Sequence, residues 1–315
     1  MIDTEAIVRE WMEAAGRHPR VGEGKSDEEF SRMWEASSGT YSCDRYSVIR
    51  DDVVRHLDSK GLLEGSVLDI GCGPGTYAVP MASRASSVLA VDLNRGMLDR
   101  LEAECRSEGI RNMRTMVCDC RAIPASCRCD LAFTSLCPPM NSPEALMEME
   151  GLGRTCAYVS SCSKDDGLEL KVWKALGRSY SYKGYNTDFP FEYLKSVGRD
   201  AELVRFKQRQ HQESSEDEVV RRFTSLVSRY RELDDGMREA IAGVVADSSE
   251  DGIVRTDTET VMGLLVWTPL VRRSPRDTSA EGPGFPGHAP CPRSHHPQVS
   301  DRVRRRPCNR HRRRI

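Results

Sequence analysis

The sequence predicts an α/β fold: a doubly wound, mostly parallel seven-stranded sheet with helices on both faces, an N-terminal helical cap and a helical insertion before the last strand. Two observations lead to this prediction. From Ser66 onward, short β-rich runs alternate with amphipathic helices, a pattern typical of parallel strands joined by helical crossovers. The first strand also runs straight into the glycine-rich turn 71–75, which opens the next helix.

The N-terminal cap is predicted to comprise residues 1–60. Its first part is polar with a helical pattern, a second helix is expected from about Ser26 to Ala36, and a third from Ser47 to Lys60, where apolar residues recur at helical spacing. The apolar face of the first helix comprises Ile7, Val8, Trp11 and Met12.

The sheet domain is predicted over residues 61–270, because strands and helices alternate there. The first five predicted strands are Val67–Ile70, Val88–Asp92, Met113–Cys118, Leu131–Ser135 and Thr155–Ser160. The helices predicted between them are Gly75–Ser83, Arg95–Ser107 and Ser142–Glu150.

After the fifth strand, the pattern predicts a helix over Lys164–Gly177, an aromatic-rich loop and a short helix over Phe191–Ser196. Ala201–Lys207 and Val261–Trp267 are strand-like and are expected to pair as an antiparallel edge. The helical insertion, about residues 212–250, lies between them and is expected to roof the carboxyl edge of the sheet. Its two amphipathic helices are Glu216–Tyr230 and Asp234–Ala246.

Charge is distributed unevenly along the 315 residues, whose formal net charge is −2. Residues 271–315 contain twelve Arg, no Lys and three acidic residues, so this tail carries +9 and the rest of the chain −11. The tail has almost no apolar periodicity, so we expect a disordered basic segment. It is either an arm for RNA and other anionic surfaces or, as we favour, a tail without function. An acidic body is not typical of a general nucleic-acid binder.

The location is expected to be cytoplasmic. No apolar run approaches the roughly 20 residues that span a bilayer, and Met1–Glu5 lacks the basic, apolar pattern of a signal peptide. The twelve Cys residues are therefore expected to be reduced thiols.

The glycine-rich turn predicts a ligand site at the end of the first strand. Glycines permit a tight turn with positive φ and close approach of a ligand to the backbone, and a helix N-terminus offers free N–H groups. The spacing here is G-x-G-x-G, unlike the G-x-G-x-x-G of dinucleotide loops, and Asp69 precedes the first glycine by two residues. A carboxylate in this position would repel pyrophosphate but suits the ammonium of an amino acid.

This run resembles motif I of the class I, Rossmann-like S-adenosylmethionine-dependent methyltransferases, and the resemblance covers roughly residues 40–165. It implies S-adenosyl-L-methionine as the cofactor. It further implies that Asp92 accepts the ribose hydroxyls, that Leu93 and Met97 flank the adenine, and that Asp119 accepts the adenine amino group. The alternative for each carboxylate taken alone is a turn residue or helix cap. The predicted cofactor-binding residues are Asp69, Gly71, Cys72, Gly73, Gly75, Asp92, Leu93, Met97, Asp119, Cys120 (through its backbone) and Ser135.

No catalytic residue is assigned from the sequence, but Tyr41 and Cys137 are candidates. In many relatives an aromatic residue near Tyr41 and Tyr46 covers the sulfonium; the alternative is a half-buried aromatic residue. Residues 137–140, Cys-Pro-Pro-Met, resemble the Asn/Asp-Pro-Pro-Tyr/Phe of amino-group methyltransferases. Cys is a poor acceptor and Met has no ring, so that activity does not transfer. Cys137 remains a candidate as a thiol in the reaction cleft.

Five cysteines fall within twenty residues, from the end of the third predicted strand to just after the fourth. They can bind zinc as thiolates or pack as small apolar residues. The Cys-x-Cys spacing does not match the usual zinc ribbons, so we predict packing and no metal site. The five are Cys118, Cys120, Cys127, Cys129 and Cys137.

The predicted function is methyl transfer from S-adenosylmethionine to a small-molecule acceptor, with the region of residues 164–250 forming the acceptor pocket. The aromatic residues Tyr180, Tyr182 and Tyr185 are expected either to line this pocket or to pack beneath it. The alternatives are an RNA or protein methyltransferase and a non-catalytic domain that binds the cofactor. Nucleic acid is a less favoured partner and a membrane is not expected; the sequence predicts no oligomeric state.

Overall fold

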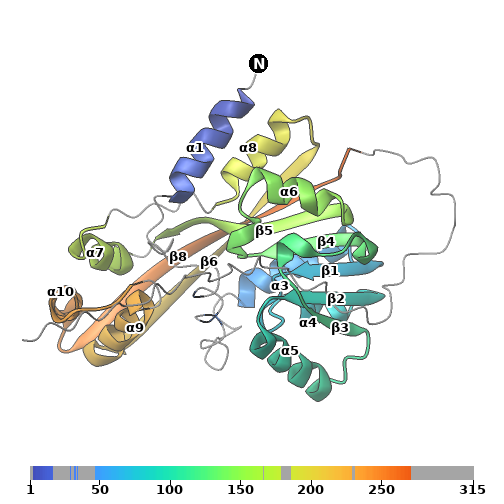
Figure 1. The fold of residues 1–315 in the computed structure, drawn as a ribbon. Helices are drawn as coiled ribbons and strands as arrows, with labels where there is room; N and C mark the ends of the chain where they lie inside the picture. Colours follow the sequence, from blue (N-terminus) through green and yellow to red (C-terminus); the bar gives the residue numbers. More distant parts are fainter. Residues whose placement is uncertain are drawn as a thin grey trace, which may run out of the picture.

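The structure is a computed structural model, shown in Figure 1, and it describes residues 3–16, 29, 32, 34, 47–165, 167–178, 186–228 and 231–270. The tail at 271–315 and the aromatic loop at 179–185 lie outside these residues, as does most of the helix predicted at 26–36.

A mixed sheet with the strand order β3-β2-β1-β4-β5-β8-β6 forms the centre of the protein. The first five strands run parallel, and β8 runs antiparallel to its two neighbours, β5 and β6. The seven-stranded, mostly parallel sheet is thus confirmed, with one short additional strand, β7 (Ser249–Glu250), paired to β8. The strands are β1 (Ser66–Ile70), β2 (Ser87–Asp92), β3 (Met113–Val117), β4 (Cys129–Ser135), β5 (Gly153–Asp165), β6 (Ala201–Ser215) and β8 (Ile253–Trp267).

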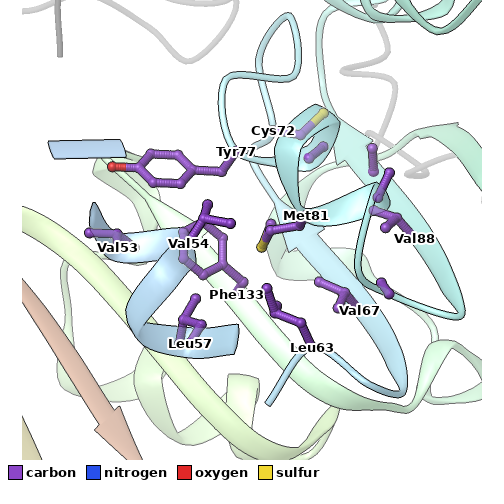
Figure 2. Packing of buried hydrophobic residues seen from close by; sticks show 14 of the residues in the cluster. Val53, Val54, Leu57, Leu63, Val67, Cys72, Tyr77, Met81, Val88 and Phe133 are labelled. Carbon is purple, nitrogen blue, oxygen red and sulfur yellow. The ribbon is translucent and has the colours of Figure 1, made fainter. Parts of the chain in front are cut away.

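Helices cover both faces of the sheet, as a doubly wound fold requires. Alternate strand residues point to opposite faces, so Val67 belongs to one apolar core and Leu68 to the other. The first core, part of which is shown in Figure 2, holds α3 (Ser47–Ser59), α4 (Ala78–Ala82) and α5 (Arg95–Ser107). The second core holds α1 (Thr4–Gly16), α6 (Pro143–Glu150) and α8 (Asp188–Ser196).

Helix α1 is attached to the second face through a fully buried tryptophan. Trp11 is 0 % exposed, and its ring lies 6.2 Å from the ring of Tyr193 on α8. Its Nε1 donates to Oδ1 of Asn141 at 3.2 Å, and the hydroxyl of Tyr158 donates to the same oxygen at 3.3 Å. The two described helices of the predicted cap, α1 and α3, therefore pack on opposite faces of the sheet.

Replacing Trp11 with Phe is expected to lower the free energy of unfolding by about 1–2 kcal/mol, because it removes a buried hydrogen bond to Asn141 and part of a packed ring. Urea unfolding measures this change. Met12→Ala, on the exposed side of the same helix, is the control and should change stability by less than about 0.5 kcal/mol. Equal effects of the two substitutions would contradict the docking of α1.

The last two long strands extend well beyond the rest of the sheet. Strand β4 ends at Ser135, which is level with Val159 of β5, Leu264 of β8 and Val204 of β6. From there β6 continues for eleven residues to Ser215, roughly 36 Å at the rise of a strand. We call residues 205–215 of β6 with residues 253–263 of β8 the β-arm. The predicted strands were too short because their apolar runs end where the polar β-arm begins.

The helical insertion lies at the far end of the β-arm (Figure 1). Helices α9 (Glu216–Ser228) and α10 (Asp235–Ala246) pack there with α7 (Gly167–Ala175) around a third apolar core. Among the described residues this core contains none from β1 to β4. The insertion therefore stands beyond the carboxyl edge, on its own core, instead of lying directly on that edge as a roof. Helix α7 begins later than predicted because β5 continues to Asp165.

Candidate functional site

The glycine-rich turn follows β1 at the edge where the parallel strands end. The N–H groups of Gly71 and Cys72 both donate to the carbonyl of Val91 on β2, at 2.8 and 3.0 Å. The φ angles of Gly71, Gly73 and Gly75 are +70°, +55° and +94°. Side chains rarely adopt these angles, so the backbone of this turn requires glycine.

The three glycines also differ in what surrounds them. A Cβ on Gly71 would meet the Sγ of Cys137 at 2.5 Å, and one on Gly75 would meet a methyl of Leu101 at 2.4 Å. A Cβ on Gly73 would meet nothing within 4 Å. Gly71 and Gly75 therefore allow close packing within the protein, whereas the space beside the Cα of Gly73 is open.

Asp92, at the end of β2, is held against this turn. Its Oδ2 accepts the N–H of Gly73 at 2.8 Å, and its Oδ1 accepts the N–H of Asn94 at 2.8 Å. A carboxylate has about four acceptor positions, so further donors such as sugar hydroxyls fit this group. Asn94 is buried and was not singled out in the sequence, although the Asp-x-Asn spacing is a signal for this contact.

Asp69 is a buried carboxyl group beside the turn. It is 2 % exposed, and its Oδ2 has no hydrogen-bond partner among the described residues. Burial and the charge of Asp92 raise the pKa of Asp69 to about 8, against the opposing effect of a hydrogen bond from the N–H of Ala78. A buried carboxyl with one oxygen free fits the ammonium group of an amino-acid-like ligand. The chain's residues at this edge therefore fit S-adenosylmethionine.

Asp119 follows β3 and is bound by an arginine that the sequence analysis did not single out. Its Oδ1 accepts hydrogen bonds from the backbone N–H and the Nε of Arg121 at 2.9 and 3.0 Å. Its Oδ2 accepts a third from Nη2 at 2.7 Å. These hydrogen bonds hold the pKa of Asp119 below its usual value. An adenine amino group would therefore use an acceptor position that Arg121 leaves open. The Asp-x-Arg spacing is the signal that would have found this pair.

The two predicted adenine neighbours differ in accessibility. Leu93 is 46 % exposed just after β2, whereas Met97 is buried on α5. Leu93 therefore presents an apolar surface to solvent, whereas the side chain of Met97 is enclosed by the protein. Both roles remain predictions.

The end of β4 contains a strained residue at the same edge. Leu136 has φ +48°, which costs a side-chain-bearing residue about 1 kcal/mol. Its N–H donates to the carbonyl of Val159 at 3.0 Å, and its side chain is 43 % exposed. The preceding Ser135 is half-buried at the last position of the strand. Sequence reasoning missed Leu136, because positive φ is not expected of leucine.

Cys120 and Cys137 follow β3 and β4 at the same edge, and the Cys120 thiol donates a hydrogen bond to Oδ1 of Asp119 at 3.7 Å. The neighbouring Cys137 thiol lowers the pKa of Cys120, whereas the Cys120 thiol and burial raise the pKa of Cys137. Cys137 therefore keeps its proton near neutral pH, and its sulfur lies against Gly71. This environment does not favour attack by a Cys137 thiolate.

Several candidates lie outside the described residues: Tyr41, Tyr46, Tyr180, Tyr182 and Tyr185. Within the part of the chain that the structure describes, no group of three or more His, Cys, Asp or Glu side chains could hold a metal ion. Cys118, Cys127 and Cys129 are buried in the second apolar core. No helix in that same part is long and apolar enough to cross a membrane.

Comparison with known families places a methyltransferase domain over this site. Residues 67–153 match the family described as "Methyltransferase domain". An uncharacterised protein of Haemophilus influenzae is 50% identical over 50 residues, which are 16% of this chain and 19% of that protein. The 23S rRNA (uracil(1939)-C(5))-methyltransferase RlmD of Pseudomonas aeruginosa is 33% identical over 99 residues, which are 30% of this chain and 22% of that enzyme. The chain thus matches only about a fifth of the length of these relatives.

Solved structures with similar folds share little sequence. The YcgJ protein of Bacillus subtilis has a TM-score of 0.43 and 14% identity, covering 69% of this chain and 98% of that one. Magnesium protoporphyrin IX methyltransferase of Synechocystis, solved with bound S-adenosylhomocysteine, has a TM-score of 0.44 and 16% identity, covering 85% of this chain and all of the other.

Proposed function

Residues 67–153 form a methyltransferase domain in a Rossmann-like fold of class I type, and from this premise we propose that the protein is an S-adenosylmethionine-dependent methyltransferase acting on a small-molecule acceptor. The observation that carries the proposal is the arrangement of Asp69, Gly73 and Asp92 around one turn. The turn combines open space beside the Cα of Gly73, a buried carboxyl with a free oxygen and a carboxylate with spare acceptor positions.

The residues of the site have separate roles in this proposal. Asp69 binds the ammonium end of the cofactor, Asp92 the ribose, and Leu93 with Asp119 the adenine. The cofactor supplies an activated methyl group when bound, so the protein chiefly orients the acceptor and excludes water. No general base is assigned, because Asp69, Asp92 and Asp119 are committed to the cofactor.

The charges on the β-arm favour a small-molecule acceptor over RNA. RNA binding needs cationic side chains that are free to neutralise phosphates. Each basic side chain on the described β-arm instead contacts a carboxylate, at 2.7–3.9 Å. The pairs are Arg205–Asp188, Lys207–Glu259, Arg209–Glu259, His211–Asp257 and Arg255–Glu213.

The same pairing occurs at the candidate cofactor edge. Arg95 contacts Asp99 and Glu102, and Arg121 contacts Asp119. Neither cation is therefore free for a polyanion, and Asp69 and Asp92 add acidic groups to this edge. We infer that the acceptor is not recognised through phosphate contacts with these residues.

Label transfer from methyl-labelled S-adenosylmethionine into fractionated metabolites, RNA and protein tests this proposal. We expect label in the small-molecule fraction, and none with the Asp92→Ala variant. Label in RNA would contradict the acceptor class and favour an activity like that of the RlmD relative. Cofactor binding without labelling of any fraction would contradict the proposed catalysis and favour a binding domain.

A further inference from the structure

The two faces of the β-arm differ in chemistry. Strands β6 and β8 pair in one unbroken register from Ala201 to Ser215, so alternate residues share a face. Every ionisable side chain of the β-arm stands at an odd-numbered position, and the ion pairs between these side chains lie on that face. The even-numbered positions in the middle of the β-arm hold only glutamine and threonine. We call these residues the amide–hydroxyl strip: Gln208, Gln210, Gln212, Thr256, Thr258 and Thr260.

The strip is arranged in three rows across the two strands. Each of its glutamines on β6 lies opposite a threonine on β8, beginning with Gln208 and Thr260. A glutamine amide offers two N–H donors and an acceptor oxygen, and a threonine hydroxyl both donates and accepts. The strip therefore presents hydrogen-bonding groups of both kinds without carrying charge.

The strip lies between two apolar cores, on the face that also holds the helix after the glycine-rich turn. At one end its neighbours are Phe206 and Met262, which belong to the first core together with α4. At the other end Val254 belongs to the third core. Gln208 stands four residues beyond Val204, which is level with the end of β4, and this separation is roughly 13 Å at the rise of a strand. One small molecule can therefore contact both the strip and the candidate cofactor edge.

Gln208 has an unused acceptor at the end of the strip nearer this edge. Its side chain is half-buried, and its Oε1 is buried without a hydrogen-bond partner among the described residues. A buried acceptor without a donor costs stability, so such an atom in a native structure points to a missing partner. At the far end of the strip, by contrast, Oε1 of Gln212 accepts a hydrogen bond from Arg222 on α9 at 3.2 Å.

We propose that the amide–hydroxyl strip binds the acceptor of the methyl group, and that this acceptor is an uncharged small molecule rich in hydroxyl groups. The proposal rests on the proposed function and specifies its substrate class. A ligand hydroxyl can donate to Oε1 of Gln208 and also accept from an amide or a threonine of the strip.

The contrast between the two faces supports an uncharged ligand. A charged acceptor needs an opposite charge to offset its desolvation, and the six residues of the strip supply none. The ionisable side chains of the same two strands are all on the other face, where they pair with one another or with Asp188. In the proposed arrangement the reacting end of the acceptor lies at the carboxyl edge. Its remote hydroxyl groups lie on the strip, where their binding energy orients the reacting end.

Methyl transfer to fractionated metabolites tests the substrate class. A cell extract is first separated by ion exchange into anionic, cationic and neutral small molecules, and each fraction is incubated with the full-length protein and methyl-labelled S-adenosylmethionine. The unreacted cofactor is then removed on a cation exchanger, because its sulfonium is positively charged. We expect the label in products of the neutral fraction. More label in either charged fraction, in RNA or in protein would overturn the proposal.

Two variants test the strip itself. Gln208→Leu and Thr258→Val keep the size of the side chains and remove their hydrogen-bonding groups. Each should raise the amount of neutral fraction needed for half-maximal labelling about tenfold, which corresponds to about 1.4 kcal/mol, within the range of one hydrogen bond. The affinity for S-adenosylhomocysteine should stay within about twofold. Arg209→Gln, at the next position of β6 but on the charged face, is the matched control and should label like the wild type.

Urea unfolding separates recognition from a merely structural role. Gln208→Leu removes a buried acceptor without a partner, so the free variant should be at least as stable as the wild type. Destabilised variants, or unchanged half-maximal amounts in both Gln208→Leu and Thr258→Val, would overturn the role of the strip. In the second case the proposed function still stands, because the neutral fraction is labelled. If the wild type does not bind S-adenosylhomocysteine, the proposed function itself fails, and the role of the strip fails with it.

Discussion

The stability of the cofactor-free Asp69→Asn variant relative to the wild type is expected to rise steadily as the pH rises from 4 to 8. Asp69 has a pKa of about 8 in the folded protein, raised by burial and by Asp92, against a value of 3.8 when it is not buried. Between these values the unfolded chain releases the proton while the folded chain keeps it, which favours unfolding. The group's contribution to stability is complete below pH 4 and lost by pH 8, a change on the order of 5 kcal/mol.

Urea unfolding of both proteins at pH 5 and pH 8 measures this effect. The gain in the variant should grow between the two values, even though the buried amide of Asn costs about 1–3 kcal/mol at either pH. Asp200→Asn, which alters a solvent-exposed carboxylate, is the control and should show no such trend. A stability difference between Asp69→Asn and wild type that does not depend on pH would contradict the raised pKa.

The same variant is expected to lose cofactor affinity. The ammonium of the cofactor favours an ionised Asp69, so wild-type binding of S-adenosylhomocysteine should tighten as the pH rises towards 8. Binding to Asp69→Asn should be weak and nearly independent of pH in this range. In the proposed function, Asp69 destabilises the cofactor-free protein in exchange for binding the ligand, which is common at functional sites.

Asp92→Ala is expected to weaken S-adenosylhomocysteine binding at least about 100-fold. The substitution removes hydrogen bonds from the ribose hydroxyls to a charged acceptor, worth about 3 kcal/mol together. It also removes the two hydrogen bonds, each 2.8 Å long, that the N–H groups of Gly73 and Asn94 donate to Asp92. Calorimetry should find micromolar-range binding in the wild type and strongly reduced binding in the variant.

Two further variants separate loss of recognition from local unfolding. Asp92→Asn keeps one acceptor oxygen without the charge, so its loss of affinity should be intermediate. Asp99→Ala removes an exposed carboxylate from α5 and should bind like the wild type, since Asp99 contacts only Arg95 among the ion pairs described for it. Undiminished binding by Asp92→Ala would overturn the role assigned to the end of β2.

The fold and the glycine-rich turn were predictable because local sequence determines them. Alternating apolar residues such as Val67 and Leu68 identify a strand covered on both faces, and positive φ at Gly71, Gly73 and Gly75 requires glycine whatever the surroundings. The lengths of β6 and β8 were not predictable in this way. Beyond Phe206 the polar β-arm is stabilised by strand pairing and cross-strand ion pairs, which hydrophobic periodicity does not report.

The sequence by itself determined the order of strands and helices along the chain, the turn at residues 71–75, and the positions of acidic residues at the ends of successive strands. Each of these features depends only on residues that are neighbours in the chain. Only the tertiary structure decided which side chains meet. It enclosed Asp69 and placed the Cys137 sulfur against Gly71. These contacts depend on burial and on the packing of loops from different strands, so their physical consequences appear only when the sheet is assembled.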